Sequence, residues 1–139
     1  MSPLNSAEID ALVRAARGVR DRAYAPYSGY RVGAALRAKD GRVFTGVNVE
    51  NSAYPTSMCA DRNALATAVG VGVREFTAVA VVTAADDQGL PGSPCGACRQ
   101  ALAEFGIGVD VILATDEGPE YTVLRLDELL PRAFSGKNL

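Results

Sequence analysis

The 139-residue sequence contains no histidine and no tryptophan, and it has only three cysteines. Without histidine, the chain cannot form a Ser-His-Asp triad, a Cys-His nucleophile pair or a histidine-ligated metal site. An odd number of cysteines without an export signal argues against a disulfide framework and favours metal or thiol chemistry. Few catalytic chemistries remain after these exclusions.

The sequence also lacks strong charge and long apolar segments. The formal net charge is −2 and the basic residues are scattered, so we expect no general attraction to nucleic acid or to an anionic membrane. Residues 1–18 include acidic residues and no apolar block, so no signal peptide is expected. No segment approaches the length of a membrane span. These features predict a soluble, cytoplasmic protein.

The apolar spacing predicts a single α/β domain that spans residues 1–139. Asn5 and Glu8 resemble a capping box at the start of the first helix. Helices are predicted over residues 6–22, 59–71, 95–105 and 127–134. Strands are predicted over residues 30–38, 43–50, 76–84, 109–115 and 121–126. This order predicts a three-layer α/β/α fold with a five-stranded mixed sheet.

The three cysteines stand at the starts of two predicted helices. Cys95 and Cys98 form a C-x-x-C pair, which alone fits zinc ligation, a redox dithiol or coincidence. Cys59 begins the preceding helix, and two helices on one face of a sheet can point their N-termini at a common place. Three thiolates with one open position suit catalytic zinc, whereas structural zinc normally has four protein ligands. The zinc interpretation accounts for all three cysteines, whereas the redox interpretation leaves Cys59 unexplained.

Two arginines follow these cysteines. Three thiolates around one dication leave a negative centre, which helix N-termini and the cationic Arg62 and Arg99 could offset. An arbitrary helical arginine more often belongs to a solvated face. Beside a metal centre made only of cysteines, we favour a role in supporting the metal ligands, and we favour it more for Arg62 than for Arg99.

Four segments carry a resemblance to a known family. CADRNA (59–64) and PCGACRQ (94–100), preceded by YAPYSGYRVGAAL (24–36) and GVNVENSAYP (46–55), resemble the small homotetrameric, zinc-dependent cytidine deaminases. The resemblance implies deamination of cytidine or deoxycytidine to uridine or deoxyuridine, with release of ammonia, in pyrimidine salvage. It implies one zinc per chain on Cys59, Cys95 and Cys98. In this chemistry a zinc-activated water attacks C4 of the pyrimidine, and a glutamate carries protons.

The resemblance also implies substrate-binding residues. Asn48 and Glu50 would bind the ribose hydroxyls, and the backbone of Ala60 would contact the base. Tyr30 stands where the family usually has Phe against the substrate. Without the resemblance, the more common interpretation is that Asn48 and Glu50 share a solvent-exposed strand face and that Tyr30 is a core residue.

Two further aromatic residues are assigned to subunit contacts by the same resemblance. Phe134 would reach the active site of a neighbouring subunit, although a core position is the simpler reading of an isolated phenylalanine. Tyr54 would lie near a subunit boundary. The chain is therefore expected to form a homo-oligomer, with a tetramer as the state that the family implies.

Asp61 occupies the position where the family has its catalytic Glu. In isolation, an aspartate near a helix start is a common cap. In the proton-carrying position its carboxylate is retracted by about 1.5 Å, and displacements near 1 Å can cost on the order of a hundredfold in rate. We therefore predict intact zinc and nucleoside binding with strongly reduced turnover.

Two alternatives remain open. The chain could be a catalytically silent nucleoside- or zinc-binding member of the family. It could also deaminate another cytosine nucleoside such as blasticidin S. The blasticidin deaminases share the PC-x-x-CRQ segment, but we expect them to lack the ribose-binding glutamate of the NVE string, which favours cytidine or deoxycytidine.

Overall fold

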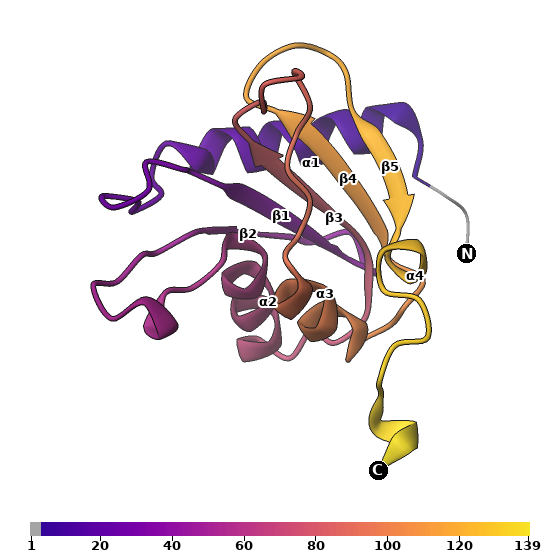
Figure 1. Cartoon of the computed structure of the whole chain (residues 1–139). Helices are drawn as coiled ribbons and strands as arrows, with labels where there is room; N and C mark the ends of the chain where they lie inside the picture. The colour runs from indigo at the N-terminus through magenta and orange to yellow at the C-terminus, as the bar shows by residue number, and fades with distance from the viewer. Residues whose placement is uncertain (1–3) are drawn as a thin grey trace.

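The computed structural model describes residues 4–139, which form a five-stranded sheet between two helical layers (Figure 1). The strands are β1 (Gly33–Ala38), β2 (Val43–Val47), β3 (Phe76–Thr83), β4 (Asp110–Thr115) and β5 (Thr122–Arg125). The helices are α1 (Ser6–Arg20), α2 (Ala60–Gly70), α3 (Gly96–Ala103) and α4 (Leu126–Leu129), with short 3₁₀ turns at Tyr54–Thr56 and Gly136–Asn138. The strand order is β2-β1-β3-β4-β5, in which β3 and β4 are parallel and the other neighbours antiparallel. The predicted three-layer fold with a mixed sheet is confirmed.

Strand β3 is buried because each of its two faces packs against a separate hydrophobic core. Three of its residues pack on α1, which covers one face of the sheet (Figure 1): Ala78, Ala80 and Val82. Val79 and Val81 point to the opposite core, which includes residues of α2 and α3. Burial on both faces explains why this strand reads as a near-continuous apolar run rather than as an alternating one.

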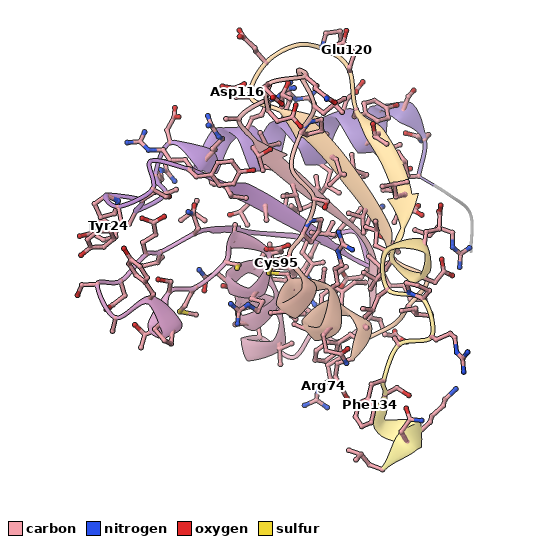
Figure 2. The ribbon with its side chains drawn as sticks, viewed as in Figure 1. Tyr24, Arg74, Cys95, Asp116, Glu120 and Phe134 are labelled. Atoms are coloured by element: carbon pink, nitrogen blue, oxygen red, sulfur yellow. The ribbon has the colours of Figure 1, made fainter. Side chains whose placement is uncertain are left out.

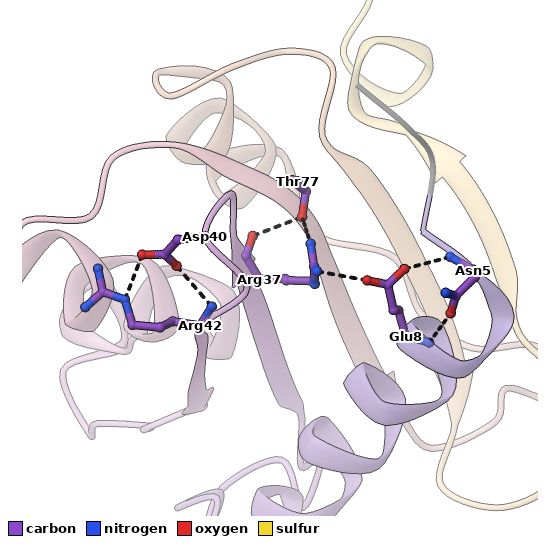
Figure 3. A network of polar contacts seen from close by, with 6 residues as sticks. All are labelled: Asn5, Glu8, Arg37, Asp40, Arg42 and Thr77. Atoms are coloured by element: carbon purple, nitrogen blue, oxygen red, sulfur yellow. Dashed lines mark hydrogen bonds and ion pairs between the residues drawn. The ribbon is translucent and has the colours of Figure 1, made fainter.

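The N-terminus of α1 is tied to the sheet by polar contacts (Figure 3). The Asn5 side chain accepts from the Glu8 backbone N–H at 2.8 Å, and the Glu8 carboxylate accepts from the Asn5 N–H at 3.0 Å, which is the predicted capping box. Glu8 also pairs with Arg37 of β1 at 2.9 Å. Arg37 in turn donates to the Thr77 hydroxyl of β3 at 3.1 Å. The first turn of the helix is therefore fixed to two strands.

Two glycines let the helices approach the sheet closely. A Cβ on Gly33 of β1 would overlap the Ala16 carbonyl oxygen of α1. A Cβ on Gly46 of β2 would overlap the Ala60 carbonyl oxygen and lie 2.5 Å from the Ala64 nitrogen, both in α2. Backbone atoms cannot swing aside as a flexible side chain can. Gly46 therefore sets how closely the first turns of α2, next to Cys59, lie on the sheet.

Two predicted strands are longer than the observed ones. β1 begins at Gly33 rather than at residue 30, and β2 ends at Val47 rather than at residue 50. Beyond Val47 the backbone pairs with Tyr24 and Met58 instead of with β1, and the Asn48 amide takes the place of further β1–β2 pairing. Its Oδ1 accepts from the Val32 N–H at 2.8 Å, and its Nδ2 donates to the Tyr30 carbonyl at 2.8 Å. Asn48 and Tyr30 therefore lie beyond the ends of the strands.

The last predicted helix, residues 127–134, is wrong in its extent. Helix α4 covers only Leu126–Leu129, so Leu126 belongs to the helix and not to the strand before it. Pro131 has no N–H to continue the helix, and Arg132 has a positive φ of 53°. Phe134 follows in an irregular tail. The first three helices end one or two residues before their predicted limits, as is usual at frayed helix ends.

Within residues 4–139, no helix combines the length and the apolar character that crossing a membrane requires.

Substitution Gly46→Ala is expected to destabilise the fold by about 1–3 kcal/mol, because the added methyl group meets the backbone of α2. Thermal unfolding monitored by circular dichroism measures the change. Gly18→Ala in α1 is the matched control, since a Cβ at Gly18 would have no neighbour within 4 Å. An unchanged unfolding temperature for Gly46→Ala would show that this close approach does not constrain the fold.

Candidate active site

The starts of α2 and α3 bring the three cysteine sulfurs together, as the sequence predicted. Cys59 and Cys95 are the N-cap residues of the two helices, and Cys98 lies in the first turn of α3. The Sγ atoms of Cys59 and Cys95 are 3.8 Å apart, and those of Cys95 and Cys98 are 3.3 Å apart. All three sulfur atoms lie within 4.8 Å of one another.

The sulfur geometry fits a zinc ion. Zn–S bonds of about 2.3 Å in a tetrahedral site separate two sulfur ligands by about 3.8 Å. The measured separations of 3.3 and 3.8 Å lie close to this value. Cys98 is buried and Cys95 is exposed, so the cluster is open on one side. The donor set therefore suits a metal held by three thiolates with one position left free.

Arg62 lies beside the cluster. Its Nη2 atom is 3.6 Å from the Cys59 sulfur. The neighbouring Cys98 thiol, with a further contribution from Arg62, lowers the pKa of Cys59 to about 5. The same contact with Cys59, together with burial, raises the pKa of Cys98. The cationic Arg62 therefore favours the thiolate form of the neighbouring Cys59.

Arg99 makes different contacts from Arg62. Its guanidinium donates to the Pro94 carbonyl at 2.8 Å, to the Leu129 carbonyl at 2.8 Å and to the Ser93 hydroxyl at 2.9 Å. These bonds join α3 to the preceding loop and to the end of α4. Arg62 thus lies against a cysteine sulfur, whereas Arg99 is bonded to the surrounding loops, and the supporting role of Arg62 stays a prediction.

The cluster opens into a cavity of about 260 Å³. Most of the sequence-predicted site residues line it: Tyr30, Asn48, Glu50, Ala60, Asp61 and the three cysteines. Sequence reasoning missed other lining residues, among them Val81, Thr83, Ser93 and Pro94. Two of these directly precede the C-x-x-C pair, and the other two end the buried strand β3. The C-x-x-C pair could have indicated Ser93 and Pro94, whereas a valine and a threonine near the end of a strand carry no such signal.

Asp61 is a buried carboxyl group on the wall of this cavity. The residue is only 3% exposed, and its Oδ2 atom has no hydrogen-bond partner among residues 4–139. Burial raises the pKa of Asp61, and the neighbouring Cys98 thiol opposes the rise. The helix-cap alternative is disfavoured, because Cys59 occupies the N-cap position of α2. A buried carboxyl with a raised pKa beside a candidate metal centre has the properties of a proton carrier.

Glu50, another residue that lines the cavity, is held in place by residues 27–28. Its carboxylate accepts hydrogen bonds from the Tyr27 N–H at 3.0 Å, from the Ser28 N–H at 3.1 Å and from the Ser28 hydroxyl. The Ser28 hydroxyl is the main cause that lowers the pKa of Glu50. Glu50 is thus a fixed, ionised acceptor at the cavity.

The two predicted subunit-contact residues lie outside the cavity. Tyr54 is 71% exposed and packs edge-on against Tyr27, with ring centroids 6.2 Å apart, beside a second cavity of about 460 Å³ that also includes Glu50. Phe134 is 60% exposed on the C-terminal tail, away from Cys95 (Figure 2). The fold does not bring either side chain to the cysteine cluster of its own chain.

Comparisons with known proteins agree with this site. The family profile described as "Cytidine and deoxycytidylate deaminase zinc-binding region" matches residues 6–114. A cytidine deaminase of Sporosarcina psychrophila is 46% identical over 132 residues, which is 95% of each chain. One of Halalkalibacterium halodurans is 42% identical over 129 residues, which is 92% of this chain and 95% of the relative.

Solved structures show the same fold. The crystal structure of cytidine deaminase from Burkholderia pseudomallei aligns with a TM-score of 0.84 at 46% identity, covering 90% of this chain and 98% of the other. That of Mycobacterium tuberculosis aligns with a TM-score of 0.73 at 36% identity, covering 91% and 96%. Fold, sulfur cluster and profile together define a protein with a deaminase-type zinc-binding region. The chain belongs to the cytidine deaminase family.

The purified protein is expected to contain close to one zinc per chain, and Cys98→Ser is expected to lose most of it, because a hydroxyl is a far poorer zinc ligand than a thiolate. Elemental analysis of both proteins tests this. Ala97→Ser, at an exposed position of the same helical turn, controls for general damage to α3. Equal zinc in wild type and Cys98→Ser would exclude the three-sulfur site.

Proposed function

We propose that the chain catalyses the hydrolytic deamination of cytidine or deoxycytidine to uridine or deoxyuridine, with release of ammonia, as a step of pyrimidine salvage. One observation carries this proposal: a three-cysteine cluster and a buried carboxyl group, Asp61, line the same cavity. The similar proteins named cytidine deaminase support the same reaction. Residues 1–139 would act as one domain.

Zinc held by Cys59, Cys95 and Cys98, one ion per chain, would supply Lewis-acid activation of water. Arg62 and the N-termini of α2 and α3 would offset the excess thiolate charge. This role of Arg62 is supported by its contact with the Cys59 sulfur.

Asp61 would carry the protons of the reaction. Hydrolytic loss of an amino group requires a proton taken from water and protons delivered to the base and to the leaving nitrogen. Asp61 is a buried carboxyl beside the sulfur cluster, and its raised pKa brings its proton exchange closer to neutral pH. Its side chain is one methylene shorter than the glutamate expected at this position, so proton transfer would be inefficient.

The nucleoside would be held from three sides. Glu50 and Asn48 would bind the ribose hydroxyls, and the Tyr30 ring would lie against the substrate. The base would meet the backbone of Ala60, which is the first residue of α2 and whose N–H therefore has no partner within the helix. All four residues line the cavity, which supports these roles.

A free nucleoside fits the charges of the cavity better than a nucleotide. Of the described residues that line it, none is Lys or Arg, whereas Glu50 and Asp61 are acidic. A phosphate group would meet like charge without a basic partner. A neutral sugar would find a fixed carboxylate as a hydrogen-bond acceptor.

We further propose that the active form is a homotetramer, with Tyr54 at a subunit boundary and Phe134 contributed to a neighbouring active site. The support is the exposure of both aromatic side chains in the single chain. Tyr54 also contacts the exposed ring of Tyr27, and contiguous exposed apolar groups commonly mark contact surfaces.

A catalytically silent, nucleoside-binding protein is the second candidate function, and the short Asp61 side chain is the observation that favours it. The two candidates share the cavity and the zinc site. They differ only in whether turnover is measurable.

Substitution Asp61→Glu is expected to raise kcat for cytidine on the order of a hundredfold or more, because the carboxylate regains its reach. The loss of cytidine absorbance measures turnover, with zinc content determined for each protein. Asp61→Asn is the matched control, since it keeps the length of the side chain and removes the carboxylate. Equal turnover in wild type and Asp61→Glu would contradict the argument about reach.

Substitution Glu50→Gln is expected to weaken cytidine binding by about 10- to 100-fold, as expected for loss of a hydrogen bond to a charged group. Isothermal titration calorimetry with the Asp61 protein gives the dissociation constant with little turnover. Glu75→Gln, in an exposed pair with Lys39 at a cavity without cysteines, is the control. An unchanged dissociation constant for Glu50→Gln would remove this residue from the nucleoside site.

A further inference from the structure

Tyr30 and Gly92 meet beside the active-site cavity, although they come from two separate loops. A Cβ on Gly92 would overlap the Tyr30 hydroxyl oxygen. Gly92 is not among the glycines with positive φ, so its backbone conformation does not require glycine. Glycine is therefore required at position 92 for steric reasons, because the phenol group of Tyr30 occupies the space that a side chain would need.

Thr83 fixes Gly92 relative to the sheet. Its Oγ1 accepts a hydrogen bond from the Gly92 N–H at 2.7 Å and donates one to the Ala84 carbonyl at 3.0 Å. Thr83 is the last residue of β3 and only 2% exposed, so its hydroxyl is held at a fixed place at the end of the sheet. The Thr83 hydroxyl thus ties Gly92 to the end of β3, and Gly92 would have to break this hydrogen bond to move away from Tyr30.

The backbone of Tyr30 is also held. Its N–H donates to the Ser28 hydroxyl at 3.0 Å, and its carbonyl accepts from the Asn48 side chain at 2.8 Å. The side chain itself is 45% exposed and lines the cavity. With the backbone fixed on both sides, a group added at Gly92 could be accommodated only if the Tyr30 ring moved.

We propose that Gly92 is a positioning residue. Thr83 holds its backbone, and because Gly92 has no side chain, the Tyr30 hydroxyl packs against it; this contact fixes the position of the Tyr30 ring at the cavity. A side chain at position 92 displaces the ring and changes the space available to the nucleoside. The effect on nucleoside binding rests on the proposed function. The steric coupling of the two residues does not.

A double-mutant cycle of Gly92→Ala, Tyr30→Phe and the double variant tests this. Loss of the hydroxyl removes the atom that the new methyl group would overlap. Gly92→Ala is expected to weaken cytidine binding about tenfold with Tyr30 present and less than about twofold with Phe at position 30, a coupling of the size found for residues in contact. Calorimetry gives the dissociation constants, and zinc content is measured for all four proteins.

Gly70→Ala, at the end of α2 away from Cys59, is the control for an added methyl group, since a Cβ there would have no neighbour within 4 Å. An equal Gly92→Ala penalty in both backgrounds would overturn the proposal. A penalty that appears together with loss of zinc would also overturn it, because the substitution would then act through the metal site.

The proposal and the proposed function can fail separately. If the wild-type protein binds no cytidine, the proposed function fails, and the cycle is read from unfolding temperatures. Non-additive temperatures with rescue in the double variant then support the positioning role, and additive temperatures overturn it. If Gly92→Ala alone does not fold, a folded double variant supports the proposal and an unfolded one overturns it.

Discussion

The close approach of α2 to β2 is the constraint on which the cysteine site depends. Backbone atoms of the first turns of this helix lie directly over Gly46, with no side chain between them. Cys59 caps the helix at this end, so the packing distance of the helix fixes the position of its sulfur. Sulfur ligands have to meet within a few ångström, and a shift by the thickness of one methyl group would separate Cys59 from Cys95. The sulfur cluster is therefore assembled by helix-on-sheet packing, and Arg99 fixes the start of the other helix to the preceding loop and to α4.

Elements with a clear apolar period could be predicted from the sequence, because burial on the sheet imposes that period. The strands over residues 76–83 and 110–115 and the first helix were predicted within two residues of their observed ends. The errors fall where a side chain or a proline decides the backbone instead. The Asn48 amide replaces strand pairing next to β1 and β2, and Pro131 stops the last helix. Residue preferences averaged over a segment do not contain these single contacts.

Some residues of the candidate site could likewise be predicted from the sequence, and others could not. Cysteine spacing and the missing histidines pointed to the three-sulfur cluster, and the resemblance to cytidine deaminases supplied Tyr30, Asn48, Glu50 and Asp61, which the fold gathers at one cavity. Thr83 and Gly92 could not have been selected, because a threonine at a strand end and a glycine in a loop are ordinary. Their importance arises only from contacts between segments far apart in sequence. Tyr54 and Phe134 remain predictions about a neighbouring subunit.

The side chains of Asp61 and Arg62 indicate the position of the candidate active site better than the size of the cavities does. A larger cavity, of about 570 Å³, lies at the turns of residues 38–42 and 72–75, and its described lining includes none of the predicted site residues. Asp61 Oδ2 and Arg62 Nε, in contrast, are buried without hydrogen-bond partners in residues 4–139. Both atoms belong to the first turn of α2, beside the sulfur cluster. Under the proposed function this position would serve the reaction: Arg62 would balance thiolate charge, and Asp61 would offer an oxygen to a substrate proton.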